Sequence, residues 1–202
     1  MFSRLVVALL LLVWTVLPAI ADVYNNGPTS GESNSWPINF GFASSDSFVV
    51  NGTSADITSL QFAAWLFPGD TLDTVEVSIT LDEFGGTTYF DQILSTNQSD
   101  CSLNPFGFNV CTETANFNLN LPGGTFWVNL GNAVVGNGDP AYWDENSGPS
   151  SASENQIGTT YSEAFTLNGT VNQTGTAPEI SSILMFGTGI VGLAGVLRRK
   201  FF

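Results

Sequence analysis

The sequence predicts an all-β protein folded as an antiparallel β-sandwich. Apolar and polar residues alternate along several stretches, most clearly where the apolar positions are Val75, Val77, Ile79 and Leu81. This alternation places the apolar side chains on one face of a strand. Residues 22–176 contain no capped amphipathic helix pattern. Two sheets packed face to face would bury such faces, with roughly eight strands and jelly-roll connectivity as one arrangement.

Further strands and turns follow from composition. Residues 60–67 are largely apolar on both faces, as in a central strand. Alternating patterns recur in residues 116–121, 125–130 and 165–167. Turns rich in Gly, Pro and Asn are predicted at residues 68–70, 85–86, 122–124 and 136–140. The polar residues 22–36 are expected to form an irregular lead-in, and residues 146–156 a long surface loop.

The N-terminal segment, residues 1–21, has the pattern of a secretory signal peptide. Arg4 precedes an apolar run from residue 5 to residue 17, and Ala19 and Ala21 form a small-x-small cleavage site. Residues 22–169 are then the β-sandwich domain and residues 170–176 a polar linker. The portion between the two terminal segments is about 155 residues long, enough for one domain with a sizeable core.

The C-terminal segment, residues 177–202, predicts a transmembrane helix with a basic end. The apolar run from Ile180 to Leu197 would span roughly 27 Å as a helix. Its membrane-embedded residues would include Ile183, Leu184, Ile190, Val191, Leu193 and Leu197. Arg198, Arg199 and Lys200 follow, and such clusters stay in the cytoplasm. The chain is therefore expected to be exported and arrested at this helix.

The order of these parts resembles the PEP-CTERM sorting signal of exported bacterial proteins. Pro178 and Glu179 match the first two positions of its Pro-Glu-Pro motif, whereas Ile180 stands where the family has a second Pro. Short sequence segments of the body also resemble those of exported proteins of this group. They are residues 67–72, 107–111, 129–134 and 142–149.

The resemblance implies an exosortase-type membrane protease that cuts near the motif, after transient anchoring in the inner membrane. The body would then reach the cell surface or an extracellular polysaccharide matrix. A plain single-span anchor is the alternative. The resemblance implies location and processing, not a reaction.

Charge is unevenly distributed along the chain. The basic residues are Arg4, Arg198, Arg199 and Lys200, and there is no His, whereas seventeen of the eighteen acidic residues lie from Asp22 to Glu163. Nucleic-acid binding through phosphate neutralisation is therefore excluded for the body, as is His or Lys catalysis. Its carboxylates must be exposed, hydrogen-bonded or matched by an external cation, and a solvated acidic surface is the simplest expectation.

The two cysteines, Cys101 and Cys111, have nine residues between them in a domain expected to be exported. A disulfide is the default for such a pair in an oxidising compartment. Closing this loop would contribute on the order of 3 kcal/mol. Zinc would need more ligands than two thiols.

The segment with the most chemically versatile side chains is residues 139–146. Aromatic rings beside carboxylates and an amide suit a sugar site, which here would use Tyr142, Trp143, Asp144, Glu145 and Asn146. Alternatively the rings cover the core and the acids face solvent. Asp139 and Asp144 are candidate Ca²⁺ ligands, because Ca²⁺ takes six to eight hard oxygens. No other cofactor is expected.

Glycoside hydrolysis is the catalytic chemistry that this composition best supports, since it needs two carboxyl groups about 5 to 9.5 Å apart. Asp144 and Glu145 are adjacent, however, and on a strand they would point to opposite faces. We therefore expect no catalytic activity. The expected partners are the membrane, an exosortase-type protease and an exopolysaccharide.

Overall fold

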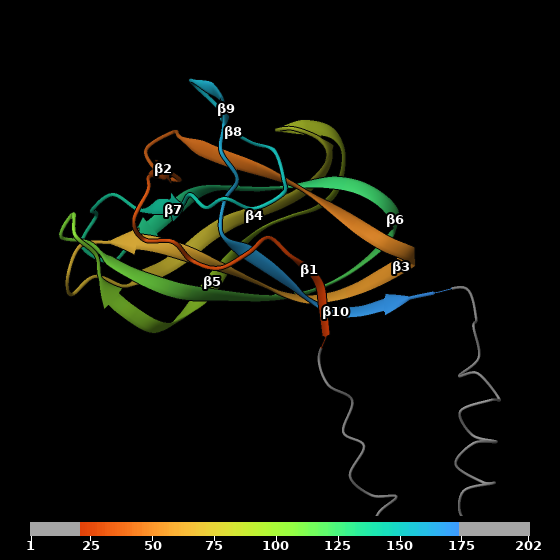
Figure 1. The fold of residues 1–202 in the computed structure, drawn as a ribbon, viewed down its shortest axis with the longest axis horizontal. Coiled ribbons are helices and arrows are strands. Elements are labelled where there is room, and N and C mark those ends of the chain that lie inside the picture. Colours follow the sequence, from red (N-terminus) through yellow and green to blue (C-terminus); the bar gives the residue numbers. More distant parts are fainter. Residues whose placement is uncertain (1–20, 174–202) are drawn as a thin grey trace, which may run out of the picture.

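The computed structural model describes residues 21–173, which form ten strands and contain no helix. All strand pairs are antiparallel, so the predicted all-β antiparallel class is confirmed (Figure 1). The predicted signal peptide and sorting segment lie outside the described residues, apart from Ala21. Within this range there is no helix of the length and apolarity needed to cross a bilayer.

The strands differ greatly in length. Their bounds are β1 (Ala21–Asn25), β2 (Ser35–Pro37), β3 (Ala43–Leu66), β4 (Leu72–Asp82), β5 (Gly85–Leu103), β6 (Asn109–Val135), β7 (Tyr142–Asp144), β8 (Ala152–Glu154), β9 (Gly158–Thr160) and β10 (Phe165–Asn172). The principal order is β1-β10-β3-β6-β4-β5, with β5 also paired to β6. Strands β7 and β8 pair with β3, and they carry β2 and β9 at their other edges. Since β3, β5 and β6 change partners along their lengths, the sheet folds over on itself.

The sheet bends where β3 and β6 cross from one part to the other. Their register shifts between Val50 and Ser54, opposite the glycines of β6. A Cβ atom on Gly123 would lie 2.0 Å from the carbonyl oxygen of Gly52, so the two backbones meet more closely than any side chain permits. The predicted turn at residues 122–124 is therefore wrong. The chain bends there without leaving β6, because pairing with β3 resumes on both sides.

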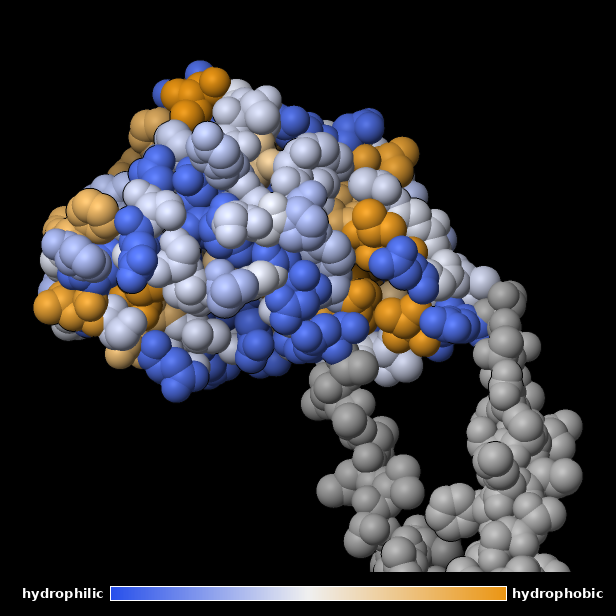
Figure 2. All heavy atoms as spheres, viewed as in Figure 1, coloured by the Kyte–Doolittle hydropathy of each residue, from blue (hydrophilic) through white to orange (hydrophobic). Residues whose placement is uncertain are grey.

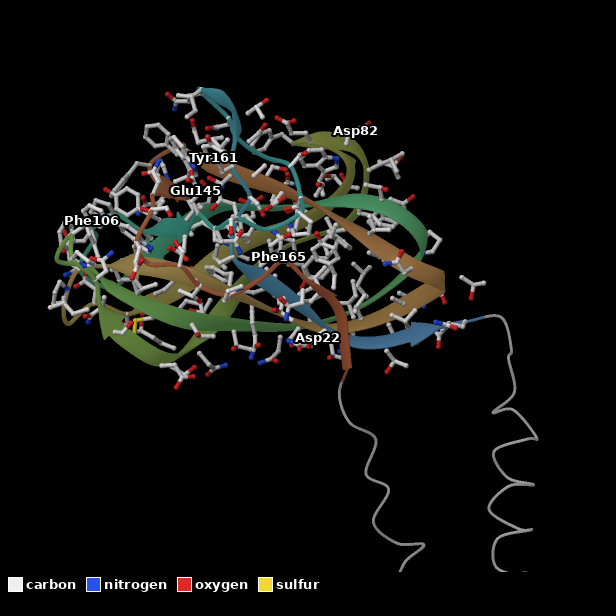
Figure 3. The ribbon with its side chains drawn as sticks, in the orientation of Figure 1. Asp22, Asp82, Phe106, Glu145, Tyr161 and Phe165 are labelled. Atoms are coloured by element: carbon white, nitrogen blue, oxygen red, sulfur yellow. A yellow bond between two sulfur atoms is a disulfide. The ribbon has the colours of Figure 1, made fainter. Side chains whose placement is uncertain are left out.

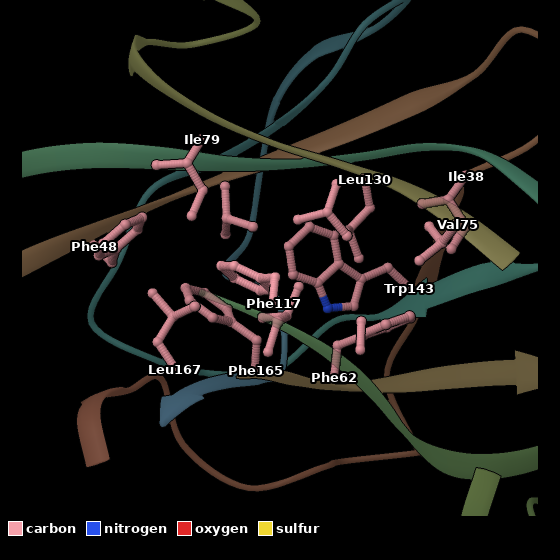
Figure 4. Close-up of a cluster of buried hydrophobic side chains, with 14 of the residues drawn as sticks. Ile38, Phe48, Phe62, Val75, Ile79, Phe117, Leu130, Trp143, Phe165 and Leu167 are labelled. Atoms are coloured by element: carbon pink, nitrogen blue, oxygen red, sulfur yellow. The ribbon is translucent and has the colours of Figure 1, made fainter. Parts of the chain in front are cut away.

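The larger of two clusters of buried hydrophobic residues lies inside the folded sheet (Figure 4). The alternation predicted in β4 is confirmed at Val75, Val77 and Ile79, which are fully buried, whereas Leu81 is exposed beside the β4–β5 turn. Large core side chains come from strands that are far apart in the sequence, for example Phe48 of β3 and Leu167 of β10. The core therefore depends on contacts between distant segments.

Three polar segments differ from their predicted structure. The lead-in contains β1 and β2, and residues 170–172 complete β10 in place of the start of a linker. The predicted surface loop at residues 146–156 contains β8, where Ser153 and Glu154 are each 2% exposed. Its composition misleads because polar side chains can be buried next to backbone partners: Oε2 of Glu154 accepts the backbone N–H groups of Gln156 and Ile157, each at 3.1 Å.

Candidate functional site

The central residue of the predicted sugar site, Trp143, is fully buried. Its indole N–H donates to the carbonyl oxygen of Ala164 at 3.0 Å, and its ring packs edge-on against Phe62 and Phe165 (Figure 4). A ring enclosed in this way has no face free for a sugar. The prediction of a stacking role for Trp143 is therefore wrong, and the ring belongs to the core.

Asp144 is buried, and its carboxylate accepts hydrogen bonds from three N–H groups. Its Oδ1 accepts the indole N–H of Trp65 at 2.6 Å and the backbone N–H of Gly31 at 3.0 Å, and its Oδ2 accepts the N–H of Ser30 at 2.7 Å. Burial raises the pKa of Asp144, and these three N–H groups oppose that rise. Both oxygens are engaged, so the predicted calcium and sugar ligand instead fixes the loop at residues 29–31.

The other predicted site residues also serve the structure. Glu145 accepts the indole N–H of Trp36 at 3.0 Å, and the side-chain amide of Asn146 donates to the carbonyl oxygen of Asn26 at 2.8 Å. Both are 7% exposed. Tyr142 is half-buried and its ring lies edge-on to Phe108. Among the described residues, no group of three or more His, Cys, Asp or Glu side chains is arranged to hold a metal ion. The candidate calcium ligand Asp139 is therefore not part of such a group.

A groove on the outer side of the sheet lies beside the loop of residues 29–31 that Asp144 binds. It consists of two adjoining hollows of about 390 and 400 Å³, both lined by Thr29 and Thr112, and we call it the outer groove. Its other polar lining residues are Asn25, Ser30, Glu32, Gln61, Asp100, Ser102, Asn104 and Thr166. The lining is thus rich in hydroxyl and amide groups, with two carboxylates in the second hollow.

The loop between Cys101 and Cys111 forms one wall of the second hollow. The predicted disulfide is present, with the two Cα atoms 4.0 Å apart. Within the loop, Oδ1 of Asn104 accepts the backbone N–H groups of Phe106 and Phe108 at 3.0 and 2.9 Å. The Nδ2 of Asn104 is buried and has no hydrogen-bond partner within the described structure.

An aromatic cluster continues from this loop. Phe106 stacks on Trp65 with ring centroids 5.6 Å apart, and Phe108 contacts Trp65, Phe67 and Tyr142. Phe106 is 57% exposed. It lies at one end of the molecule (Figure 3), where Figure 2 shows hydrophobic surface, as it also does at the top and on the right. The aromatic cluster is therefore connected to the second hollow through the 101–111 loop, which carries both Phe106 and the lining residue Pro105.

A second unusual feature is inside the protein. Six carboxylic side chains are buried, namely Asp46, Glu113, Asp144, Glu145, Glu154 and Glu163. No Lys, Arg or His occurs in residues 21–173 to offset their charge. The expectation of a solvated acidic surface is thus wrong for about a third of the carboxylates of the body. An ionised carboxylate without such an offset is costly to bury.

Asp46 and Glu163 differ in how they are accommodated. Oδ2 of Asp46 accepts the side-chain amide of Asn26 at 3.0 Å and the backbone N–H of Glu163 at 2.6 Å. Burial nevertheless raises the pKa of Asp46 to about 6. Both carboxyl oxygens of Glu163 lack a partner within the described structure. Burial raises the pKa of Glu163 well above its usual value, as do the charges of Asp46, Glu145 and Asp144.

Glu113 is a separate buried acid on β6. It lies directly opposite Phe62 of β3 and is fully buried. Burial raises the pKa of Glu113 to about 7. It is not among the charges that act on Glu163, so the interior holds acids in at least two places.

Sequence reasoning missed Asn104, Thr112, Asp46 and Glu163. The sequence does carry a signal for Asp46, which is in phase with Phe48 and Val50 and so points inward on β3. The groove residues carry no such signal, because five strands (β1, β3, β5, β6 and β10) and the loops between them bring these residues together. No known protein-family model matches the chain, and a search of curated proteins found no relative.

Proposed function

We propose that this is a non-catalytic exported protein that is sorted through its C-terminal segment to the cell surface or extracellular matrix. The observation that carries the proposal is the order of Pro178 and Glu179, an apolar stretch, and Arg198 to Lys200, combined with a signal-peptide pattern at residues 1–21. An exosortase-type protease would recognise the motif while the apolar stretch holds the chain in the inner membrane.

Two features of the body support this role. The disulfide between Cys101 and Cys111 suits an oxidising compartment. Strands β1 and β10 are paired, with Ala21 opposite Gly169, so the two ends of the body lie side by side (Figure 1). Neighbouring ends suit a body that is attached to a membrane at both ends during export.

The finer fold class is part of the proposal. We infer that the body is a β-sandwich, and jelly-roll connectivity is one arrangement of its strands that fits this class. The inward alternation of β4 and the bend shared by β3 and β6 support this class, because they place two parts of one sheet around a common core.

The test is to replace Arg198, Arg199 and Lys200 together by Gln in the full-length chain expressed in an exosortase-containing bacterium. The intact mass of the extracellular protein gives both cleavage points. We expect the variant to be released or processed abnormally, because its stop signal lacks positive charge. The matched control replaces Phe201 and Phe202 by Ser and should behave as wild type. Unchanged sorting and mass in the triple variant would exclude the proposed role.

A further inference from the structure

We propose that the outer groove binds a neutral glycan, with the disulfide-closed loop of residues 101–111 as one wall and the loop of residues 29–31 as the other. This goes beyond the sorting role and does not depend on it, because it concerns what the folded body recognises. Three features of the groove indicate such a ligand: its lining, the unpartnered side-chain amide of Asn104 and the fixed position of both walls.

The charge of the groove selects the ligand class. Glu32 and Asp100 line its second hollow, and residues 21–173 contain no basic side chain. A phosphate, sulfate or uronic acid would therefore meet like charge without a cation to offset it. A wholly apolar ligand would leave hydroxyl and amide groups without water or partners. Sugar hydroxyls can donate to carboxylates and accept from amides, so they match both kinds of group.

Asn104 gives the most specific indication of a missing partner. Because its Oδ1 accepts two backbone N–H groups, the orientation of the amide is fixed and Nδ2 is left to face other atoms. Nδ2 is buried without a partner, and Asn104 lines the second hollow. Buried donors are almost always hydrogen-bonded in folded proteins. A ligand hydroxyl oxygen in the hollow would supply the acceptor after a small outward shift of the Asn104 side chain, because Nδ2 has almost no accessible surface in the unliganded protein.

Both walls are held in place before any ligand arrives. The 101–111 loop is closed by its disulfide, and the other loop is tied to Asp144 through the N–H groups of Ser30 and Gly31. Asp144 also receives the indole N–H of Trp65, on which the exposed ring of Phe106 stacks. A preformed site avoids much of the entropy cost of ordering loops on binding.

The size of the groove indicates an oligosaccharide. Each hollow, at about 390 and 400 Å³, falls within the roughly 300 to 1,000 Å³ typical of small-ligand sites. Thr29 and Thr112 line both hollows, so they would contact a chain that passes from one to the other. Phe106 directly follows Pro105, which lines the second hollow, and offers an apolar ring to a sugar at that end.

The test is calorimetric binding of the purified, oxidised full-length protein to neutral hexasaccharides of glucose, mannose, galactose and xylose, with hexagalacturonate as the acidic probe. We expect binding of at least one neutral hexasaccharide and none of hexagalacturonate. Thr112→Val removes a hydroxyl group and nearly preserves the shape of the side chain. Asn104→Asp removes the unpartnered Nδ2 donor and keeps the Oδ1 acceptor. Each should weaken neutral-glycan binding about fivefold or more.

The matched controls are Thr125→Val and Asn118→Asp, which lie at exposed positions of the same strand, β6, outside the groove. Both should bind within twofold of wild type. Thermal unfolding and thiol titration establish that each variant is folded and oxidised. If Asn104→Asp does not fold, Thr112→Val decides the question. Failure of every neutral probe to bind at millimolar concentration, equally tight binding of hexagalacturonate, or wild-type affinity in Thr112→Val would overturn the proposal.

Discussion

The backbone N–H of Glu163 donates to Oδ2 of Asp46 at 2.6 Å, so an acid that precedes β10 is held against an acid of β3 inside the protein. Tyr24 lies close enough for the charge of Asp46 to raise the pKa of the phenol, although burial is the larger cause. Around this pair no basic side chain of the described residues compensates a negative charge. The proton is therefore the partner that these carboxyl groups can take most readily from water.

The first prediction concerns the dependence of stability on pH. Folded-state pKa values of about 6 for Asp46 and about 7 for Glu113 lie above the usual values of 3.8 and 4.5. At pH values between the usual and the folded-state pKa values, the folded protein thus binds more protons than the unfolded chain. The free energy of unfolding should be greatest near pH 4 and fall as pH rises to about 8. Urea unfolding at a series of pH values measures it.

Asp46→Asn separates this effect from general acidity. For Asp46 alone the rise in pKa corresponds to about 3 kcal/mol at high pH. Asn can still accept the N–H of Glu163 but cannot ionise, so the variant should be more stable than wild type at pH 8. Exposed Asp22→Asn is the control and should follow the wild-type curve. A wild-type stability that is constant or increases from pH 4 to pH 8 would contradict this account.

The second prediction concerns the hydrogen bonds that the Asp144 carboxylate accepts. Asp144→Ala leaves the indole N–H of Trp65 and the backbone N–H groups of Ser30 and Gly31 without their acceptor. We expect the free energy of unfolding to fall by about 3 kcal/mol. Asp144→Asn keeps one acceptor and should lie between this variant and wild type. Chemical denaturation is the measurement, with exposed Glu83→Ala as the control. A loss of less than 1 kcal/mol in Asp144→Ala would show that water replaces the carboxylate.

The sequence predicted the strand class and the disulfide because both follow from local signals. Alternation in Val75, Val77 and Ile79 needs no knowledge of the rest of the chain, and neither does the pairing of two cysteines in a domain expected to be exported. The bend at Gly123 could not be predicted, because a Pro-Gly-Gly run signals a turn unless a partner strand holds it. That partner, Gly52, is 71 residues away in the sequence.

The candidate site was hard to predict for a related reason. Trp143 beside two acids resembles an exposed sugar platform, but burial depends on Phe62 and Phe165 from other strands. Asn104 becomes informative through its hydrogen bonds rather than its residue type. Sequence therefore identified that aromatic and acidic side chains gather near residues 139–146, but not that most of them are buried.

The third prediction tests the bend. Gly123→Ala would place its Cβ 2.0 Å from the carbonyl oxygen of Gly52, so the two strands must separate locally. We expect a loss of about 2 to 4 kcal/mol in the free energy of unfolding. Gly85→Ala is the matched control, because its Cβ would meet nothing closer than 3.9 Å. Equal stability of the two variants would mean that β3 and β6 do not approach at these glycines.

The fourth prediction joins the disulfide to the outer groove. Replacing Cys101 and Cys111 by Ser should lower the free energy of unfolding by about 3 kcal/mol, since the unfolded chain regains the freedom of the loop. The same change should weaken neutral-glycan binding at temperatures where the variant is folded, because Asn104 and Ser102 lie on strand and loop residues that the disulfide holds against β6. Wild-type protein reduced with a phosphine should match the double variant in both measurements. Reduced protein that keeps full affinity would show that backbone pairing and the Asn104 side chain are sufficient to fix this wall of the groove.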